Sequence, residues 1–336
     1  MSLILKPRKF PRNLRLFEAV VRRLPADHSF RIKAEKRHGQ LLSGHFGEVS
    51  TEYIFQSPLF EGSSVFHNLR LEYYKDRFLE IDTLLVFPQL IVIFEIKYLA
   101  GKSVLFRGNP PQMIRTHMNT EIAEDIYEDP ILQAKQQVKN LQHWLQINNL
   151  PKIPIEPFAV MSNIKANIII DSSYKEPHRI LRKTMVESTV ETFFTEAGFQ
   201  TGMQPPIREL TSKLLSSHRE DRRKAIDRFP VKYTEFLKGV HCPKCFRMPM
   251  NRAHGMWHCT FPECSYRCKD ALYHTLLDYY LLASDTITNQ SLRNFCRIDS
   301  PYTAYRQIKN LKLPMKGNRK SSVYCLKALF EPLLGE

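Results

Sequence analysis

Two acids and a lysine in one apolar stretch are the residues of this sequence best suited to catalysis. Asp82 stands in a run rich in Ile, Leu, Val and Phe, residues 78–87, while Glu95 and Lys97 stand in a second such run, residues 90–98. Runs of this composition predict half-buried β-strands. Only a Pro-Gln pair separates the two runs, which predicts a tight turn and therefore a hairpin.

The register of this hairpin decides where its charges point. With an even-length loop at the Pro-Gln pair, residues whose numbers sum to 177 face each other, so Asp82 is predicted opposite Glu95 and Glu80 opposite Lys97. Side chains alternate along strands, so all four project from one face. Like charges directly opposite each other destabilise a hairpin, and the arrangement makes sense if a cation lies between the two acids. Oxygen-only ligation suits Mg²⁺ or Mn²⁺.

A second interpretation of the same residues needs no cation. Glu80 and Lys97 would form an exposed cross-strand ion pair, and Asp82 and Glu95 would simply point into water. A motif this short is weak by itself. The neighbouring motifs therefore decide between the two interpretations.

The motifs around the hairpin resemble those of the nuclease-related domain (NERD) branch of the PD-(D/E)XK nucleases. The motifs that carry the resemblance are, in chain order, Gly47-Glu48 in an expected helix, Asp82, Glu95-Ile-Lys97, and residues 129–134 at the start of another helix. They occur in the order found in the family, and the resemblance covers roughly residues 41–165.

This resemblance implies a metal-dependent nuclease site. Asp82 and Glu95 would bind a divalent metal, Mg²⁺ or Mn²⁺, and Lys97 would position the nucleophile. Glu48 would assist the metal, and Gln133 would complete the site.

Further elements must hold these side chains together, and the sequence predicts an α/β fold. The expected helices span 41–56 and 130–149, and the expected strands span 65–74, 78–87, 90–98, 102–107, 155–161 and 166–170. The first four strands should form a meander with the hairpin in its middle. Asp129 should cap the second helix and Pro130 should occupy its first turn. This order of helices and strands predicts a mixed α/β sandwich, and the resemblance implies a mixed-sheet, restriction-endonuclease-like core with helices on both faces. The stretch 107–128 is long for the family and could reshape access to the site.

Four cysteines have the most specific spacing in the chain. Cys242 and Cys245 form a Cys-x2-Cys pair, and after a gap of 13 residues Cys259 and Cys264 form a Cys-x4-Cys pair. Two such pairs predict a tetrahedral zinc ribbon. Because four thiolates leave no open position, the zinc is expected to be structural. The segment resembles the zinc ribbons attached to topoisomerases. Three nearby residues are left out of the predicted ligand set: His241, His258 and Cys268.

The C-terminal segment is expected to be a small, helical, winged-helix-like DNA-binding domain. Helical patterns at 272–282, 288–296 and 300–309 precede a hairpin tip at 316–320. Residues 297–327 hold eight Lys or Arg against one acid, which suits contacts to phosphates by a recognition helix and a wing. The residues predicted to contact DNA are Thr303, Arg306, Gln307, Lys309, Lys316, Arg319 and Lys320.

The composition favours a polyanionic partner. It also indicates a folded protein with hydrophobic cores. The net charge is 49 − 34 = +15 and the pI is near 9.5, which is typical of nucleic-acid-binding proteins. A hydrophobic content of 43% excludes a disordered chain. No apolar run is long enough to span a membrane, and the N-terminal run is too short for a signal peptide, so we expect a cytoplasmic protein with reduced cysteines.

These observations predict a modular nuclease. The expected parts are a basic N-terminal arm at 1–40, the nuclease-like domain at 41–170, a helical connector at 171–238, the zinc ribbon at 239–270 and the winged-helix-like domain at 271–336. The expected function is that of a Mg²⁺- or Mn²⁺-dependent deoxyribonuclease, whose C-terminal modules bind the DNA. The alternative is a non-catalytic DNA-binding protein on a nuclease-like scaffold.

Overall fold

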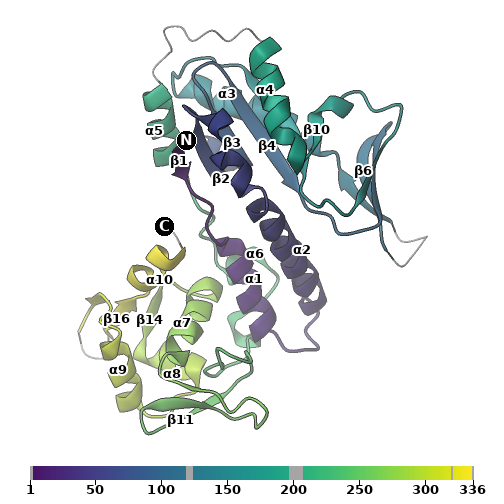
Figure 1. Cartoon of the computed structure of the whole chain (residues 1–336). Helices are drawn as coiled ribbons and strands as arrows, with labels where there is room; N and C mark the ends of the chain where they lie inside the picture. Colours follow the sequence, from purple (N-terminus) through teal and green to yellow (C-terminus); the bar gives the residue numbers. More distant parts are fainter. Residues whose placement is uncertain (1–2, 119–123, 197–206, 319–320, 335–336) are drawn as a thin grey trace. The chain divides into compact units, whose positions relative to one another are not determined.

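The computed structural model describes residues 3–118, 124–196, 207–318 and 321–334 (Figure 1). The chain divides into two compact units: unit 1 comprises Met1–Arg8 and Leu42–Glu220, and unit 2 comprises Lys9–Leu41 and Asp221–Glu336. Within the described residues, no helix combines the length and the apolar character that crossing a bilayer requires.

A six-stranded mixed sheet forms the centre of unit 1. Its strands, in spatial order, are β1 (Leu3–Lys6), β2 (Ser64–Tyr74), β3 (Arg77–Val86), β4 (Ile91–Lys97), β8 (Ile155–Met161) and β10 (Ile180–Arg182). The pairs β2–β3 and β3–β4 are antiparallel, whereas β1–β2, β4–β8 and β8–β10 are parallel. The predicted hairpin is thus confirmed, and it lies in the middle of the sheet.

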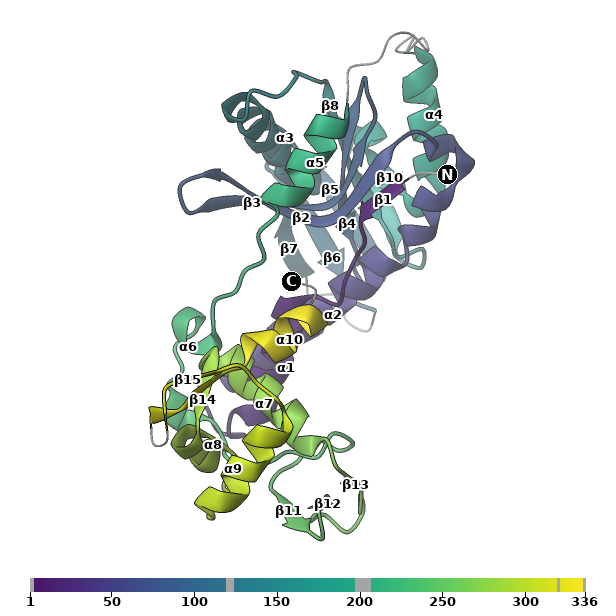
Figure 2. The ribbon, with the colours of Figure 1, turned by 90° about the vertical axis from the view of Figure 1, so that its left-hand side faces the viewer.

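Helices cover both faces of this sheet, as the sequence predicted. The helices α3 (Pro130–Ile147) and α5 (Ile207–Ser217) pack on one face through a shared apolar cluster with β2, β3 and β4 (Figure 2). On the other face, apolar residues of α4 (Val186–Glu196) and of the 3₁₀ helix η1 (Glu52–Gln56) pack against β2, β3, β4 and β8. Asp129 caps α3, because its Oδ1 accepts hydrogen bonds from the backbone N–H groups of Ile131 and Leu132 at 2.7 and 3.0 Å.

A second sheet corrects the predicted meander. The strand β5 (Ser103–Gly108) leaves the hairpin sheet and joins β6 (Pro111–Thr116), β7 (Glu124–Glu128) and β9 (Asn167–Ile170) in the order β7-β6-β5-β9. The strand that pairs with β4 on this side is instead β8, which follows α3 in the chain and runs parallel to β4. The long stretch 107–128 is therefore largely β-structure, and its buried Met113 packs with Phe106 of β5 and Ile131 of α3.

The predicted N-terminal arm and helical connector are both parts of folded units. Residues 3–6 form β1 at the edge of the large sheet, and residues 12–23 form a helix of unit 2. The connector is divided between the units near residue 220, and its helices α4 and α5 bury apolar side chains against the sheet of unit 1. The predicted break at Pro205-Pro206 lies outside the described residues. The segment is folded onto the sheet because α4 and α5 each have an apolar face, which a solvated connector would lack.

Unit 2 is built around one apolar core. Its helices are α1 (Arg12–Arg23), the first part of α2 (Arg31–Val49), α6 (Ala225–Arg228), α7 (Ala271–Leu282), α8 (Asn289–Cys296), α9 (Pro301–Asn310) and α10 (Lys327–Leu334). Its strands are β11 (Met250–Ala253), β12 (Met256–Cys259) and β13 (Arg267–Cys268) in one sheet, and β14 (Thr286–Thr288), β16 (Val323–Cys325) and β15 (Met315–Lys316) in another. Further short 3₁₀ helices of the described residues are η2 (Pro58–Phe60), η3 (Pro177–Arg179) and η4 (Lys183–Met185) in unit 1 and η5 (Tyr233–Glu235) in unit 2.

The three helices predicted for the C-terminal segment are confirmed as α7, α8 and α9. Thr288 caps α8 by accepting from the Ser291 N–H at 3.1 Å, and Ser300 caps α9 by accepting from the Thr303 N–H at 3.2 Å. The succession of α7, β14, α8, α9, β15 and β16 is winged-helix-like. The segment predicted to be a zinc ribbon and this segment do not have separate cores, however, because Trp257 of β12 belongs to the same apolar cluster as α7 and α8.

Candidate active site

The hairpin register agrees with the sequence prediction as far as the ladder runs. The pairs Thr83–Phe94 through Val86–Ile91 all sum to 177. Beyond Thr83 the two strands separate, and the Asp82 carboxylate accepts a hydrogen bond from the Ile96 N–H at 2.8 Å. Asp82 thus lies at the point where β3 and β4 diverge.

Glu80 does not lie opposite Lys97, which corrects one predicted pair. The first half of β3 pairs with β2 but not with β4, and there Glu80 lies opposite Arg70. The Arg70 Nε donates to Glu80 Oε1 at 2.9 Å, and the Glu80 side chain is 72% exposed. The reason is that β4 ends its pairing with β3 at Thr83, so this part of β3 extends into solvent as a two-stranded ribbon.

Lys97 and Glu95 meet the first turns of α3. The Lys97 Nζ donates to Glu95 Oε1 at 2.6 Å and to Gln133 Oε1 at 2.9 Å. Gln137, one helical turn after Gln133, donates from Nε2 to Glu95 Oε2 at 2.7 Å. Glu95 is only 2% exposed, so both of its oxygens are held in place by these donors. Sequence reasoning missed Gln137, although its spacing of four from Gln133 places it on the same helix face.

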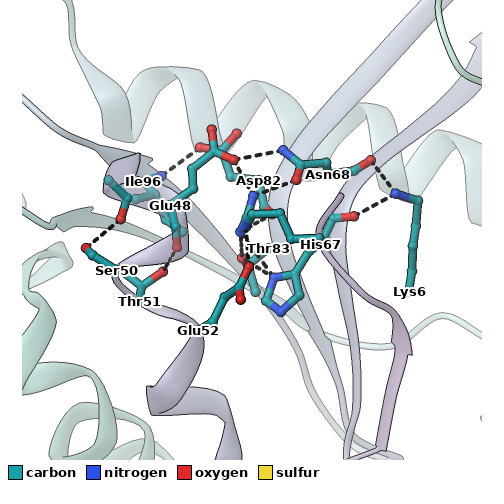
Figure 3. Close-up of polar contacts among 12 residues, drawn as sticks. Lys6, Glu48, Ser50, Thr51, Glu52, His67, Asn68, Asp82, Thr83 and Ile96 are labelled. Atoms are coloured by element: carbon teal, nitrogen blue, oxygen red, sulfur yellow. Dashed lines mark hydrogen bonds and ion pairs between the residues drawn. The ribbon is translucent and has the colours of Figure 1, made fainter. Parts of the chain in front are cut away.

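Glu48 is held by residues that the sequence motifs did not indicate. Asn68 donates from Nδ2 to Glu48 Oε2 at 2.9 Å, and the Arg8 guanidinium contacts the same oxygen. Arg8 also donates to Glu52 Oε1 at 3.1 Å and to the backbone oxygen of Asp82 at 3.3 Å. Figure 3 shows the side chains of Glu48, Asn68 and Asp82 gathered in one region. The Arg8 side chain is 1% exposed, so this cation belongs to the interior of unit 1.

Gly47 explains how Glu48 comes so near the sheet. A Cβ at this position would lie 2.3 Å from the Tyr98 Cβ and 2.9 Å from the Ser162 Oγ. Only glycine allows α2 to approach the ends of β4 and β8 this closely. The Gly47-Glu48 pair of the sequence therefore has a steric role as well as a chemical one.

Asn68 makes a second local adjustment. Its φ of 48° lies in the left-handed region, which asparagine tolerates better than most residues. The β2–β3 ladder skips this residue while pairing His67 with Thr83 and Leu69 with Ile81. The bend aims the Asn68 amide at Glu48.

The electrostatics of the cluster favour a cation. Burial raises the pKa of Asp82 to about 7, and the Glu95 carboxylate adds to the effect. Burial also raises the pKa of Glu48 to about 7, with Asp82 adding to it and Arg8 opposing it. Burial alone would lower the pKa of Lys97, but Glu95 and Asp82 raise it above its ordinary value.

The donor set fits a hard divalent ion. The carboxylate of Asp82 interacts electrostatically with those of Glu48 and Glu95, and Glu52 adds a fourth charge that contacts Arg8. Among the described residues these three carboxylates do not lie within 4.8 Å of one another, as the four cysteine sulfurs do. When all four carboxylates are ionised, their charges and those of Lys97 and Arg8 sum to −4 + 2 = −2, a surplus that protonation of Asp82 or Glu48 reduces. Carboxylate oxygens without nitrogen or sulfur donors are the ligands that Mg²⁺ and Mn²⁺ prefer.

The four predicted zinc ligands come together in unit 2. The Sγ atoms of Cys242, Cys245, Cys259 and Cys264 all lie within 4.8 Å of one another. Cys242 and Cys264 are 3.7 Å apart, and Cys245 and Cys259 are 3.6 Å apart. Zn–S bonds of about 2.3 Å in a tetrahedron require S–S separations of about 3.8 Å, so the cluster fits zinc. Among the described residues, the three that the sequence analysis excluded are not part of it.

The exposed face of α9 differs in part from the predicted one. Arg306 and Lys309 are exposed, but Thr303 and Gln307 are half-buried, because they flank the inward positions Ala304 and Ile308. Two tyrosines that the prediction omitted complete the exposed face: Tyr302 and Tyr305. Lys316 is exposed on β15, while Arg319 and Lys320 lie outside the described residues.

The sheet, the helices on both of its faces and the acids at the divergence of β3 and β4 define a restriction-endonuclease-like fold. Residues 43–162 match the family described as nuclease-related domain, so the chain contains a NERD domain with that fold. Arg8, β1, α4 and α5 lie outside the matched residues. Comparison with curated proteins and with solved structures found no match to this chain.

Proposed function

We propose that this protein is a Mg²⁺- or Mn²⁺-dependent nuclease that hydrolyses phosphodiester bonds of DNA. The observation that carries the proposal is the convergence of Glu48, Asp82, Glu95 and Lys97 from α2, β3 and β4 on one region beside Gln133 of α3. A surplus of buried acid has no structural benefit of its own, since each added carboxylate raises the energy of the others. Acids with strongly raised pKa values cluster at functional sites.

Asp82 and Glu95 would hold the divalent ion, with Glu48 assisting them. When bound, the ion would polarise the scissile phosphate and lower the pKa of a water molecule. Gln137 fixes one oxygen of Glu95, and Arg8 and Asn68 fix one oxygen of Glu48. These contacts reduce the freedom of the ligands, which is how outer contacts support a metal site.

Lys97 would act on the substrate directly. An ammonium group has three donors, and the contacts of Lys97 among the described residues use two of them, to Glu95 and to Gln133. The third can reach a phosphate oxygen or the attacking water. A cation at that place stabilises the charge that develops on the phosphoryl group in the transition state.

The basic C-terminal segment would supply DNA affinity. Residues 297–327 hold eight Lys or Arg against Asp299, and Arg306, Lys309 and Lys316 are exposed. Contacts of this kind to phosphates release counterions, so affinity should fall steeply with salt.

A nicking assay tests the proposal. Supercoiled plasmid incubated with the full chain and Mg²⁺ or Mn²⁺ should be nicked, and Asp82→Asn or Lys97→Ala should reduce the rate by at least about 100-fold. Glu80→Gln and Lys75→Ala are matched controls, because both residues are exposed on the β2–β3 ribbon away from the acids. Both controls should cleave at the rate of the unchanged chain. Absence of metal-dependent cleavage, or equal cleavage by Asp82→Asn, would refute the proposal and leave a DNA-binding protein on a nuclease scaffold.

A further inference from the structure

The C-terminal segment contains a groove that the proposed nuclease site does not use. It has a volume of about 1110 Å³ and is formed by residues of α8, α9, β15 and the segments beside them. Apolar groups, Ile308 and Leu313, line it together with the rings of Tyr305 and Tyr324. A groove of this composition suits a flat, partly apolar ligand.

The groove is also cationic. Arg293, Lys309 and Lys312 line it, and none of its lining residues in the described part of the chain is acidic. The amide side chain of Gln290 adds a group that can both donate and accept hydrogen bonds. An aromatic wall, an amide and three cations match a nucleobase with the phosphates on either side of it.

The exposed face of α9 continues this chemistry from Tyr305 and Lys309, which line the groove, to Tyr302 and Arg306, which do not. Tyr302 is 68% exposed and Tyr305 is 46% exposed, and their spacing of three residues places both rings on one side of the helix. The guanidinium of Arg306 lies 5.8 Å from the centre of the Tyr302 ring, and Lys309 Nζ lies 6.0 Å from that of Tyr305. Exposed rings with adjacent cations are typical of surfaces that stack bases and hold phosphates.

A paired duplex makes poor use of such a face. Readout in the major groove depends on Arg, Lys, Asn or Gln side chains that hydrogen-bond to base edges. On α9, the exposed Arg306 and Lys309 suit such readout, whereas the exposed rings of Tyr302 and Tyr305 do not. Within a duplex each base is already covered by its neighbours, so a tyrosine ring gains contact only with a base that has left the stack.

We propose that α9 and this groove bind an unpaired stretch of nucleic acid. Its bases stack on Tyr302 and Tyr305, and its phosphates contact Arg293, Lys309 and Lys312. The inference rests on the proposed function, because the strand held here is then part of the nuclease's substrate.

Binding of labelled oligonucleotides to the full chain, followed by fluorescence anisotropy without added divalent ions, tests this proposal. The probes are oligothymidylate, oligouridylate and a duplex of the same length. Replacing both tyrosines by Ala should weaken binding of the single strands by at least about tenfold and change duplex binding by less than about twofold. Tyr302→Phe with Tyr305→Phe should keep the affinity, since the rings remain. Tyr74→Ala is the matched control, because Tyr74 is 63% exposed and lies in unit 1.

The two single-stranded probes identify the source of the strand. Equal affinity for both supports recognition through bases and phosphates alone, and a preference for one supports the proposal with that nucleic acid as ligand. Equal loss on single strands and duplex, or no loss at all, overturns it.

Photocrosslinking keeps the proposal testable even if the Ala variants do not fold. A single strand with 5-iodouracil should crosslink to the unchanged chain at Tyr302 or Tyr305, as mapped by peptide mass analysis. Crosslinks found only outside residues 286–325 overturn the proposal.

Failure here is distinct from failure of the proposed function. Metal-dependent cleavage without tyrosine-dependent binding overturns this inference alone. Tyrosine-dependent binding without cleavage overturns the proposed function alone.

Discussion

Each unit of this protein buries a charged cluster around an arginine, and the two clusters differ in their balance of charge. In unit 1, Arg8 is 1% exposed and contacts the carboxylates of Glu48 and Glu52. In unit 2, Arg23 is fully buried and donates from Nε to Asp278 Oδ2 at 2.8 Å and from Nη1 to the Gly239 oxygen at 2.8 Å. Both arginines are well bonded, but only the cluster of unit 1 has more acids than it can neutralise.

The pKa shifts of the acids show what this difference means. For Asp278, burial alone would raise the pKa, but His241, Arg22 and Arg23 lower it well below its usual range. For Asp82, burial and the Glu95 carboxylate raise the pKa to about 7, and the opposing effects of Lys97 and Arg8 do not outweigh them. The cluster of unit 2 therefore stabilises its fold, whereas the cluster of unit 1 contains repulsion that a bound cation would relieve.

The largest effect expected in unit 2 would follow from loss of a zinc ion held by its four clustered cysteines. Cys245→Ser removes one of four thiolates, and structural zinc sites contribute about 10–16 kcal/mol in small zinc-finger peptides. Because the ribbon shares its core with α7 and α8, unit 2 should unfold while unit 1 keeps its structure. Metal analysis and thermal unfolding measure both effects. Cys325→Ser is the control and should retain zinc, so equal zinc content in the two variants would contradict the account.

Removing one buried acid from each unit tests directly whether the two charged clusters differ in their effect on stability. Asp278→Asn leaves Arg23 buried with a neutral partner and should lower the free energy of unfolding by about 3–5 kcal/mol. Asp82→Asn relieves repulsion with Glu95 in the metal-free protein and should leave stability unchanged or raise it by up to about 1 kcal/mol. Denaturant unfolding of both variants measures the contrast. A comparable loss in both would show that the acids of unit 1 are structural too.

Arg8→Gln tests the arginine of unit 1. It should free Glu48 and Glu52 without touching Lys97, and should reduce metal-dependent cleavage and Mn²⁺ affinity by about 10–100-fold. Arg77→Gln is the matched control, since this arginine is exposed at the end of the β2–β3 ribbon. Calorimetric Mn²⁺ titration and cleavage rates provide the measurement. Unchanged Mn²⁺ affinity in Arg8→Gln would mean that Arg8 serves only the packing of β1.

Alanine substitutions at two glycines of α2 should change the stability least, and in opposite directions. Gly47→Ala would bring a Cβ within 2.3 Å of the Tyr98 Cβ and should destabilise unit 1 by at least about 1 kcal/mol. Gly44→Ala meets nothing within 4 Å and should stabilise by up to about 1 kcal/mol, as expected for alanine within a helix. Melting temperatures of the two variants measure these changes in stability. A loss of stability in both would mean that the approach of α2 to β4 is looser than described.

Local patterns in the sequence predicted those parts of the molecule that depend on neighbours along the chain. The four clustered cysteines lie within residues 242–264, so their spacing alone was sufficient to predict the cluster. The strands β2, β3 and β4 and the capped helix α3 follow from apolar runs and from Asp129.

Contacts between distant segments were beyond such reasoning. Arg8 reaches Glu48 across 40 positions, and nothing in the N-terminal residues distinguishes it from other basic residues. The departure of β5 to a second sheet depends on β8 competing for the edge of β4, a choice that no single strand encodes. The exposed tyrosines of α9 were missed because the burial of Ala304 and Ile308 sets which face of that helix is outward.

Binding of Mn²⁺ to the acids of unit 1 is the most direct test of the central claim. Electron paramagnetic resonance of the zinc-loaded chain titrated with Mn²⁺ should detect bound ion in the unchanged protein and in Glu80→Gln. Asp82→Asn should bind at least about tenfold more weakly. Equal Mn²⁺ affinity in all three proteins, or no binding in any of them, would contradict the claim that these acids converge to hold a metal.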